Sequence, residues 1–208
     1  MLTDVSLTEM LFRAAAYLVV AGVHGWSLAL AAFALGDLGP RSEGRQTPSP
    51  FEHMSLSGFI AAIAVGTGWI HSLDMDAAAL RWRRVGLLVC VAGSLAVIVA
   101  LGLFASALRP AALAAFSPPL DRFSVQFLGV LGQMSLFFVV LNMLPLPPLT
   151  GGLLLSAAAP RLAGKLWRYA GWIGAIMAVV LILGRGGFLR PAVSVLRQAL
   201  TPLGFGPG

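Results

Sequence analysis

Charged residues are scarce in this sequence of 208 residues. They make up 11% of the chain, against 58% hydrophobic residues, whereas an average soluble domain is about one quarter charged. So few charges could not cover the surface of a water-soluble protein of this size. The sequence contains instead several uncharged runs of about 20 residues, the length that a helix needs to cross a membrane. The composition therefore indicates an integral membrane protein.

Cysteine and lysine are nearly absent as well. Cys90 is the single cysteine, which excludes an internal disulfide and is typical of a small buried apolar residue. Lys165 is the single lysine, so arginines supply most of the excess that gives a net charge of +6. In a membrane protein such an excess usually marks loops at the lipid headgroups. No basic run is interleaved with exposed aromatic residues, so we expect no nucleic-acid partner.

Apolar runs predict an all-α, polytopic helical bundle with about five membrane elements. We place the whole chain, residues 1–208, in a single membrane domain. The runs cover residues 14–36, 54–73, 85–108, 123–142 and 169–184. Glycines weaken the second run, which is compatible with a span or with a tilted or re-entrant element. Residues 37–53 form an irregular polar segment between the first two runs.

The basic residues do not fix the orientation of such a bundle. With five spans, seven basic residues fall on each side of the membrane. In that arrangement Arg41 and Arg45 lie on the side opposite to the cluster of Arg81, Arg83 and Arg84. The tightness of this cluster weakly favours a cytoplasmic loop there.

Two polar features interrupt the apolar runs and need an explanation. His24 lies in the middle of the first run. An ionisable residue inside a membrane is a functional-site hypothesis by default, although a single histidine is more often a neutral ring hydrogen-bonded within the bundle. Residues 142–152 hold an asparagine, three prolines and paired glycines at bilayer depth. Prolines break a helix, and broken backbone survives there only when it is buried in protein or lines a cavity.

Together these features resemble the site-2 protease family of intramembrane zinc peptidases. The family motif N-x-x-P-x-P-x-L-D-G is matched by Asn142, Pro145, Pro147, Leu149 and Gly151, with Thr150 in place of the Asp. Of the family motif H-E-x-x-H only His24 remains, because Gly25 replaces the Glu and Leu28 replaces the second His. A third motif of small bacterial members, G-R-x-T-x-x-P-x-x-H, is matched by Gly44, Arg45, Thr47, Pro50 and His53.

The resemblance implies a site-2 protease core that has lost its zinc site. A catalytic zinc needs about three protein ligands, and His24 is the one that matches. Gly25 cannot act as a general base, Leu28 cannot bind a metal, and the Thr150 hydroxyl is a poor substitute for a carboxylate. We therefore expect no catalytic residue, no zinc and no other cofactor. A new metal site built from His24, His53 and Thr150 is a remote alternative.

The leading functional hypothesis is a non-catalytic, site-2-protease-like protein, a pseudoprotease, in a bacterial inner membrane. It would serve as an accessory or scaffold subunit of a membrane-protein complex, or as a regulator of membrane proteins. Its expected partners are the lipid bilayer and other integral membrane proteins. The predicted docking groove consists of Asn142, Pro145, Pro147, Thr150 and Gly151. Small residues that permit close approach of a partner helix are Gly129, Gly132, Gly171 and Gly174.

Two other functions remain to be weighed against this hypothesis. The first is an active intramembrane zinc metalloprotease with unusual ligands, which stoichiometric zinc in the purified protein would favour. The second is a small transporter or channel. The sequence disfavours it because no Asp, Glu or Arg lies inside a predicted span, and such residues usually mark ion paths.

Overall fold

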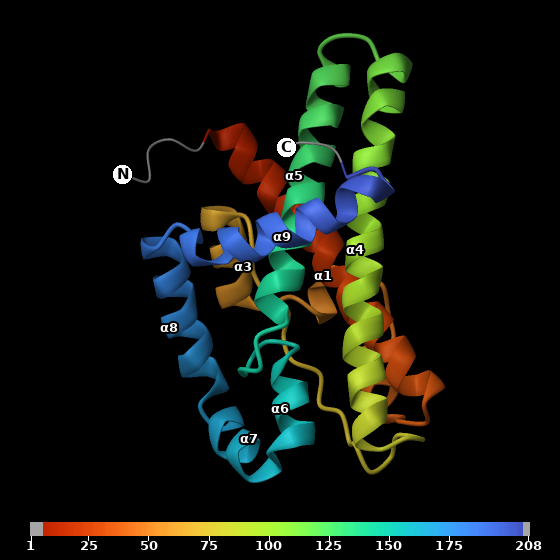
Figure 1. Cartoon of the computed structure of the whole chain (residues 1–208), viewed down its shortest axis with the longest axis vertical. Helices are drawn as coiled ribbons and strands as arrows, with labels where there is room; N and C mark the ends of the chain where they lie inside the picture. Colours follow the sequence, from red (N-terminus) through yellow and green to blue (C-terminus); the bar gives the residue numbers. More distant parts are fainter. Residues whose placement is uncertain (1–5, 206–208) are drawn as a thin grey trace.

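The computed structural model describes residues 6–205, and the regular secondary structure of this part of the chain is helical (Figure 1). No strand occurs among these residues; Met54 and Ile70 form one isolated bridge. The helices are α1 (Leu7–Ala34), α2 (Gly39–Ser42), η1 (Pro50–Glu52), α3 (Leu56–Val65), α4 (Arg84–Ala115), α5 (Leu120–Asn142), α6 (Gly152–Ala158), α7 (Pro160–Trp167), α8 (Ala170–Leu183), η2 (Gly187–Leu189), α9 (Arg190–Leu200) and η3 (Thr201–Leu203). The all-α prediction is confirmed.

Three long apolar helices, α1, α4 and α5, form the centre of the bundle. They contain 28, 32 and 23 residues, so even α5 is about 34 Å long at 1.5 Å per residue. Each is long and apolar enough to cross a membrane. One face of α1 is buried at helical spacing, through Tyr17, Val20, Ala21, His24, Leu28 and Ala32. Helix α1 thus packs against both helices of the α4–α5 hairpin.

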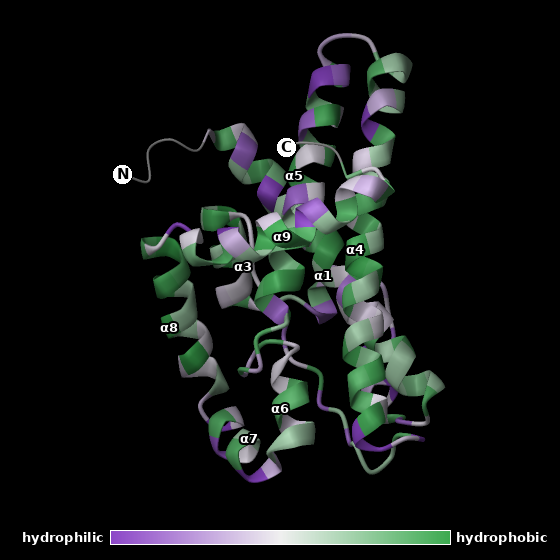
Figure 2. Ribbon diagram, viewed as in Figure 1, coloured by the Kyte–Doolittle hydropathy of each residue, from purple (hydrophilic) through white to green (hydrophobic). Residues whose placement is uncertain are grey.

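Large apolar side chains are exposed on the outside of the bundle, and hydrophobic residues make up most of the long helices in Figure 2. On α8, Trp172 and Leu183 are 74% and 80% exposed. Large apolar side chains facing outward along a helix are typical of contact with lipid. Helix α8 and the preceding α7 meet at a bend of 76°, and by length and composition the pair is either a fourth, broken span or a re-entrant loop. The described residues therefore form a multi-pass membrane protein with three or four spans.

The predicted span at residues 54–73 is not one continuous helix. Helix α3 has 10 residues, about 15 Å, which is half of the hydrocarbon thickness of about 30 Å. It ends at Gly66, whose positive φ of 81° is left-handed. The chain then runs without a helix to the start of α4. The structure thus favours the re-entrant alternative for this run over a full span.

The structure changes which basic residues lie at the same end of the bundle. The Asp37 carboxylate accepts a hydrogen bond from the backbone N–H of Asp76, and the Arg45 guanidinium donates to the carbonyls of Ser72 and His71. The polar segment after α1 and the loop before α4 therefore lie at the same end. The prediction that Arg41 and Arg45 lie opposite the 81–84 cluster is wrong, because α3 turns back instead of crossing.

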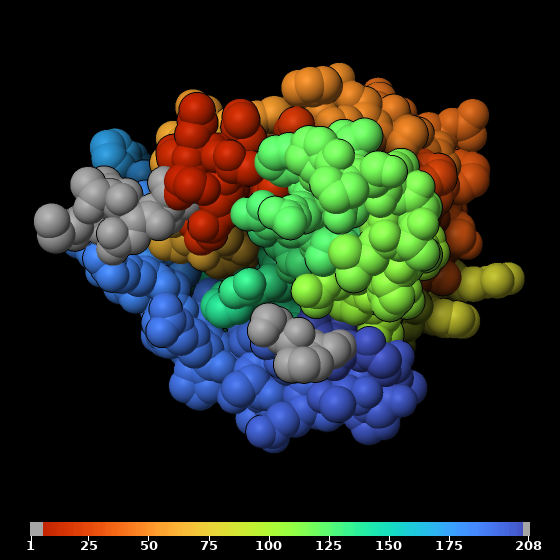
Figure 3. Space-filling view, turned by 90° about the horizontal axis from the view of Figure 1, so that it is seen from above, coloured from red at the N-terminus to blue at the C-terminus, as the bar shows by residue number. Residues whose placement is uncertain are grey.

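The opposite end gathers segments that are distant in the sequence. Seen from that end, the start of α1, the α4–α5 hairpin and α9 share one face of the molecule (Figure 3). Helix α9 crosses the long helices at a steep angle (Figure 1). Helix α9 thus lies across the side of the α4–α5 hairpin, below its tip (Figure 1).

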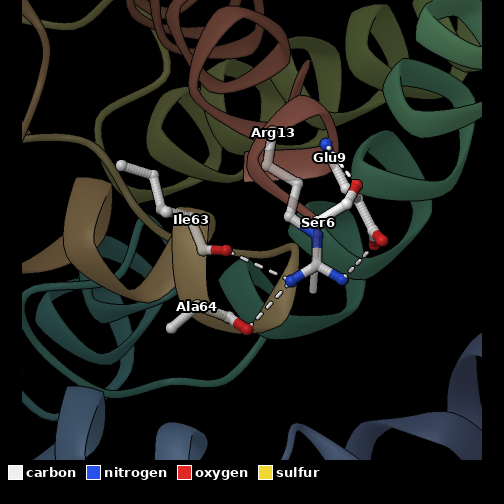
Figure 4. Close-up of polar contacts among 5 residues, drawn as sticks. All are labelled: Ser6, Glu9, Arg13, Ile63 and Ala64. Carbon is white, nitrogen blue, oxygen red and sulfur yellow. Dashed lines mark hydrogen bonds and ion pairs between the residues drawn. The ribbon is translucent and has the colours of Figure 1, made fainter. Parts of the chain in front are cut away.

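Arg13 joins α3 to α1 near this end (Figure 4). Its guanidinium donates to the carbonyls of Ile63 and Ala64, at 3.1 and 2.9 Å, and forms an ion pair with Glu9 one turn earlier on α1. The last carbonyls of a helix have no partner within it, and a cation there also matches the helix dipole. Arg13 therefore terminates the short α3 and fixes it to the first span.

The small residues expected to admit a partner helix have two different environments. A Cβ at Gly132 would contact Ser106, and one at Gly174 would lie 3.2 Å from Pro148. A Cβ at Gly129 or Gly171 would have no neighbour within 4 Å. Gly132 and Gly174 therefore serve internal packing, and only Gly129 and Gly171 leave space on the outside.

Candidate functional site

His24 and Thr150 meet in the interior of the bundle. His24 comes from the middle of α1 and Thr150 from the turn before α6, and both side chains are buried. The His24 Nε2 atom lies 2.8 Å from the Thr150 Oγ1 atom. The Phe138 ring covers the imidazole edge-on, with ring centroids 5.0 Å apart. The positions that the family resemblance assigns to the first histidine and to the aspartate are thus in direct contact.

Asn142 ties this pair to two further segments. Its Nδ2 donates to the carbonyls of Gly68 and Phe138, at 3.1 and 2.9 Å. Because a carbonyl can only accept, these two bonds fix the orientation of the amide. Its Oδ1 then faces Thr150 and accepts from the backbone N–H at 3.3 Å and from the hydroxyl at 3.4 Å. The hydroxyl thus donates to Asn142, which leaves its lone pairs to accept from His24.

The turn between α5 and α6 holds Thr150 in place by close backbone contacts. The N–H of Gly151 donates to the Asn142 carbonyl at 2.7 Å. A Cβ at Gly151 would meet the Asn142 and Leu144 carbonyls, and one at Gly152 would lie 2.9 Å from the Pro147 nitrogen. Both positions therefore require glycine for space rather than for a positive φ.

Burial divides the predicted docking residues into two groups. Asn142, Pro147, Thr150 and Gly151 are buried, whereas Pro145 is exposed. Its neighbours Met143 and Leu144 are 59% and 40% exposed. Most of the predicted groove is thus internal, and the part that a partner can reach is the 143–145 turn, defined by Met143, Leu144 and Pro145.

The space beside Gly25 is filled by another histidine. A Cβ at Gly25 would collide with the ring of His53, and one at Gly22 would lie 2.7 Å from the Pro48 carbonyl. Two glycines one turn apart on α1 therefore let residues 47–53 pack directly against the helix. Sequence reasoning noted His53 but missed this contact, although the Gly22 and Gly25 spacing was a signal for it.

The His53 ring is bonded within its own loop. Its Nε2 lies 2.8 Å from the Thr47 carbonyl, an acceptor, so Nε2 carries the proton. Burial lowers the pKa of His53, and the bond to Thr47 only partly opposes the shift. The Nδ1 atoms of His53 and His24 have no hydrogen-bond partner among the described residues. His53 is thus directed to its own loop, while His24 is directed to Thr150.

Leu28, at the position of the second family histidine, is a core residue. It is 1% exposed and belongs to the apolar cluster of α1, α4 and α5 that includes Ala29, Cys90 and Val91. One helical turn separates it from His24, so both are on the buried stripe of α1. An apolar side chain therefore stands on the face where the resemblance expects a ligand.

Comparison with known proteins supports the resemblance on which these positions rest. The chain is 31% identical over 145 residues to a Bacillus subtilis (strain 168) protein named "Putative zinc metalloprotease YwhC". The match covers 66% of this chain and 64% of that relative, so it spans just under two thirds of the relative's length. No family model matches the chain, and no solved structure matches it. The similarity supports a site-2-protease-like membrane protein.

Proposed function

We propose that this chain is a non-catalytic, site-2-protease-like protein of a bacterial inner membrane that binds a transmembrane segment of another membrane protein. In this role it is an accessory or scaffold subunit, or a regulator of membrane proteins. The observation that carries the proposal is the direct contact between His24 and Thr150, at 2.8 Å. In the family resemblance these are the positions of the first histidine and the aspartate, two of the three zinc ligands.

The geometry of this contact does not fit zinc. Tetrahedral zinc holds nitrogen and oxygen ligands at about 2.0–2.2 Å, which places two ligand atoms about 3.3 Å apart with the metal beside them. Here Nε2 of His24 and Oγ1 of Thr150 are at hydrogen-bond distance, and the hydroxyl is also bonded to Asn142. A neutral hydroxyl is moreover a poor zinc ligand. The contact as it stands is a hydrogen bond, and this supports the proposal that the chain does not hold zinc here.

Gly25 and Leu28, at the other two motif positions, also support a non-catalytic role. The general base of the family motif would project from Gly25, where the His53 ring occupies the space of a side chain. The second histidine position carries Leu28, which is packed among apolar side chains. No group at these positions can activate water or complete a ligand set. We therefore derive no hydrolytic step for this chain.

The exposed 143–145 turn supports the binding role. It places Met143, Leu144 and Pro145 on the outside of the bundle, next to the buried Asn142 network. Methionine and leucine adapt to an apolar partner surface. Hydrogen bonds from the backbone N–H groups of Gly151 and Leu144 to α5 carbonyls hold the backbone of the turn. A transmembrane helix of another protein is the occupant that fits an apolar surface of this kind in a bilayer.

Metal content tests the loss of the zinc site. The chain, purified in mild detergent with zinc present, is expected to contain no stoichiometric zinc by elemental analysis. The variant Leu28→His/Thr150→Asp restores three ligands and is expected to bind one zinc per chain, because His24 is already aimed at position 150. Leu28→His alone supplies two ligands and serves as the matched control. One zinc per wild-type chain would instead favour an active metalloprotease with unusual ligands.

A further inference from the structure

A second site lies outside the Asn142 network, at the end of the bundle where α9 crosses. A cavity of about 450 Å³ opens between α4, α5, α9 and Phe205. Its polar lining residues are Ser106, Arg109, Arg122, Gln126, Gln133 and Arg197. None of the residues at the His24 site takes part in it, so the two sites are separate.

Three arginines from three helices converge on this cavity. Arg109 comes from α4, Arg122 from α5 and Arg197 from α9. No hydrogen bond or ion pair joins the side chains of Arg109 or Arg122 to another described residue, while Arg197 lies over the Phe205 ring at 5.9 Å. No acidic residue occurs among the described residues that line the cavity. A guanidinium is always charged, so the cavity holds positive charge without a counter-charge of its own.

The walls of the cavity fit a small anionic group with an apolar attachment. The side-chain amides of Gln126 and Gln133 add hydrogen-bond donors to those of the arginines. Leu113 and Val130 supply apolar surface beside them. At Gly129 an added Cβ would meet nothing within 4 Å, so the α5 wall is open at its middle. Arginine is the preferred residue for holding phosphate, through paired N–H donors.

The cavity lies at the depth of lipid headgroups. Arg84, in the basic cluster at the other end of α4, and Arg109 are separated by about 37 Å along the helix at 1.5 Å per residue. A bilayer is about 30 Å thick in its hydrocarbon core and about 40–45 Å with its headgroups. If Arg84 lies among the headgroups of one leaflet, Arg109 lies among those of the other. Helix α9, which carries Arg190 and Arg197, crosses α4 and α5 below the tip of their hairpin (Figure 1).

We propose that this cavity binds the phosphate group of an anionic phospholipid in the leaflet on the side of α9. Arg109 and Arg197 hold the phosphate from two sides, Arg122 adds charge at the rim, and the acyl chains leave along Val130 toward the bilayer core. Basic pockets between membrane helices bind such headgroups by the same chemistry. Phosphate from solution carries the same charge and is the competing source.

Thermal unfolding in detergent tests the proposal. Dihexanoyl phosphatidylglycerol is expected to raise the unfolding midpoint of the wild-type chain saturably, whereas dihexanoyl phosphatidylcholine is not. In Arg109→Gln/Arg197→Gln the apparent affinity for phosphatidylglycerol is expected to fall by about tenfold or more, because a hydrogen bond to a charged group contributes about that factor. The variant Arg161→Gln/Arg168→Gln removes the same charge at the opposite end and is expected to keep the wild-type response.

Three outcomes overturn the proposal. Equal responses of the wild type and Arg109→Gln/Arg197→Gln to phosphatidylglycerol would show that the cavity is not the site. An equal response to phosphatidylcholine would show that negative charge is not recognised. If inorganic phosphate reproduces the shift in the unfolding midpoint and competes with the lipid, the ligand of the cavity is phosphate from solution and not a phospholipid. Native mass spectrometry of retained lipid provides a second readout should the double variant unfold at a lower temperature without ligand.

Discussion

At the scale of single residues, the candidate site is decided by what fills the space beside α1. Gly25 has no side chain, and the His53 ring occupies the volume that one would need. His24, one residue earlier, turns its Nε2 to Thr150 instead. The two histidines thus lie near one short stretch of α1 but make different contacts. His53 packs against the helix, and His24 is hydrogen-bonded to the turn after α5.

Replacing Gly25 by alanine is expected to destabilise the protein by about 1–3 kcal/mol, the usual cost of overpacking. The methyl group collides with the His53 ring, and this outweighs the gain of about 1 kcal/mol that alanine brings to a helix. The measurement is the thermal unfolding midpoint in detergent.

Two variants control for effects other than this collision. Gly93→Ala, on α4 with nothing within 4 Å of the added carbon, should leave the midpoint unchanged or raise it. In a His53→Ala background the loss caused by Gly25→Ala should disappear. A loss of the same size in both backgrounds would mean that the ring is not what the methyl group meets.

At the scale of elements, the turn between α5 and α6 has some side chains that face the interior of the bundle and others that face outward. Asn142 and Thr150 face inward and join α1, α5 and the residues after α3. Met143 and Leu144 face outward from the same turn. One short segment therefore stabilises the bundle and presents an apolar surface. The proposed binding of a partner's transmembrane helix depends on this surface.

A photoreactive phenylalanine at position 143 or 144 is expected to crosslink to another membrane protein in native membranes, because both side chains point away from the bundle. The measurement is the appearance of discrete, heavier adducts after irradiation. The same residue placed at Phe104, which is 61% exposed on α4, is the lipid-facing control and should give no discrete adduct. Adducts of equal yield at all three positions would contradict a specific surface, and their absence at 143 and 144 would remove the support for a partner there.

At the scale of the whole molecule, the short α3 decides the topology. Because it ends after 10 residues at Gly66, the chain returns to the end where α1 finished. The hydrogen bond from the Asp76 backbone N–H to the Asp37 carboxylate then joins the loop before α4 to the segment after α1. The polar segment, the 81–84 cluster and α7 come to one end of the bundle, and the arginines of the proposed lipid site come to the other.

Single cysteines introduced in a Cys90→Ser background test this topology. Arg41→Cys and Trp82→Cys, at exposed positions, are expected to react with a membrane-impermeant maleimide from the same side of the membrane. Arg122→Cys and Arg190→Cys should react only from the other side. A five-span arrangement predicts instead that position 41 reacts together with 122 and opposite to 82, so labelling of that kind would refute the re-entrant path.

The sequence by itself determined the features that depend on local composition and on side-chain identity. Apolar runs marked the three long spans, prolines marked the break after Asn142, and the residues at positions 25, 28 and 150 marked where the chain departs from the motifs of the family that it resembles. Only the tertiary structure decided that His24 bonds to Thr150, 126 residues away, and that His53 fills the space at Gly25. It also decided that α3 turns back and that three separate arginines share a cavity. Each of these results depends on how distant segments pack, and a hydropathy pattern carries no information on packing between segments.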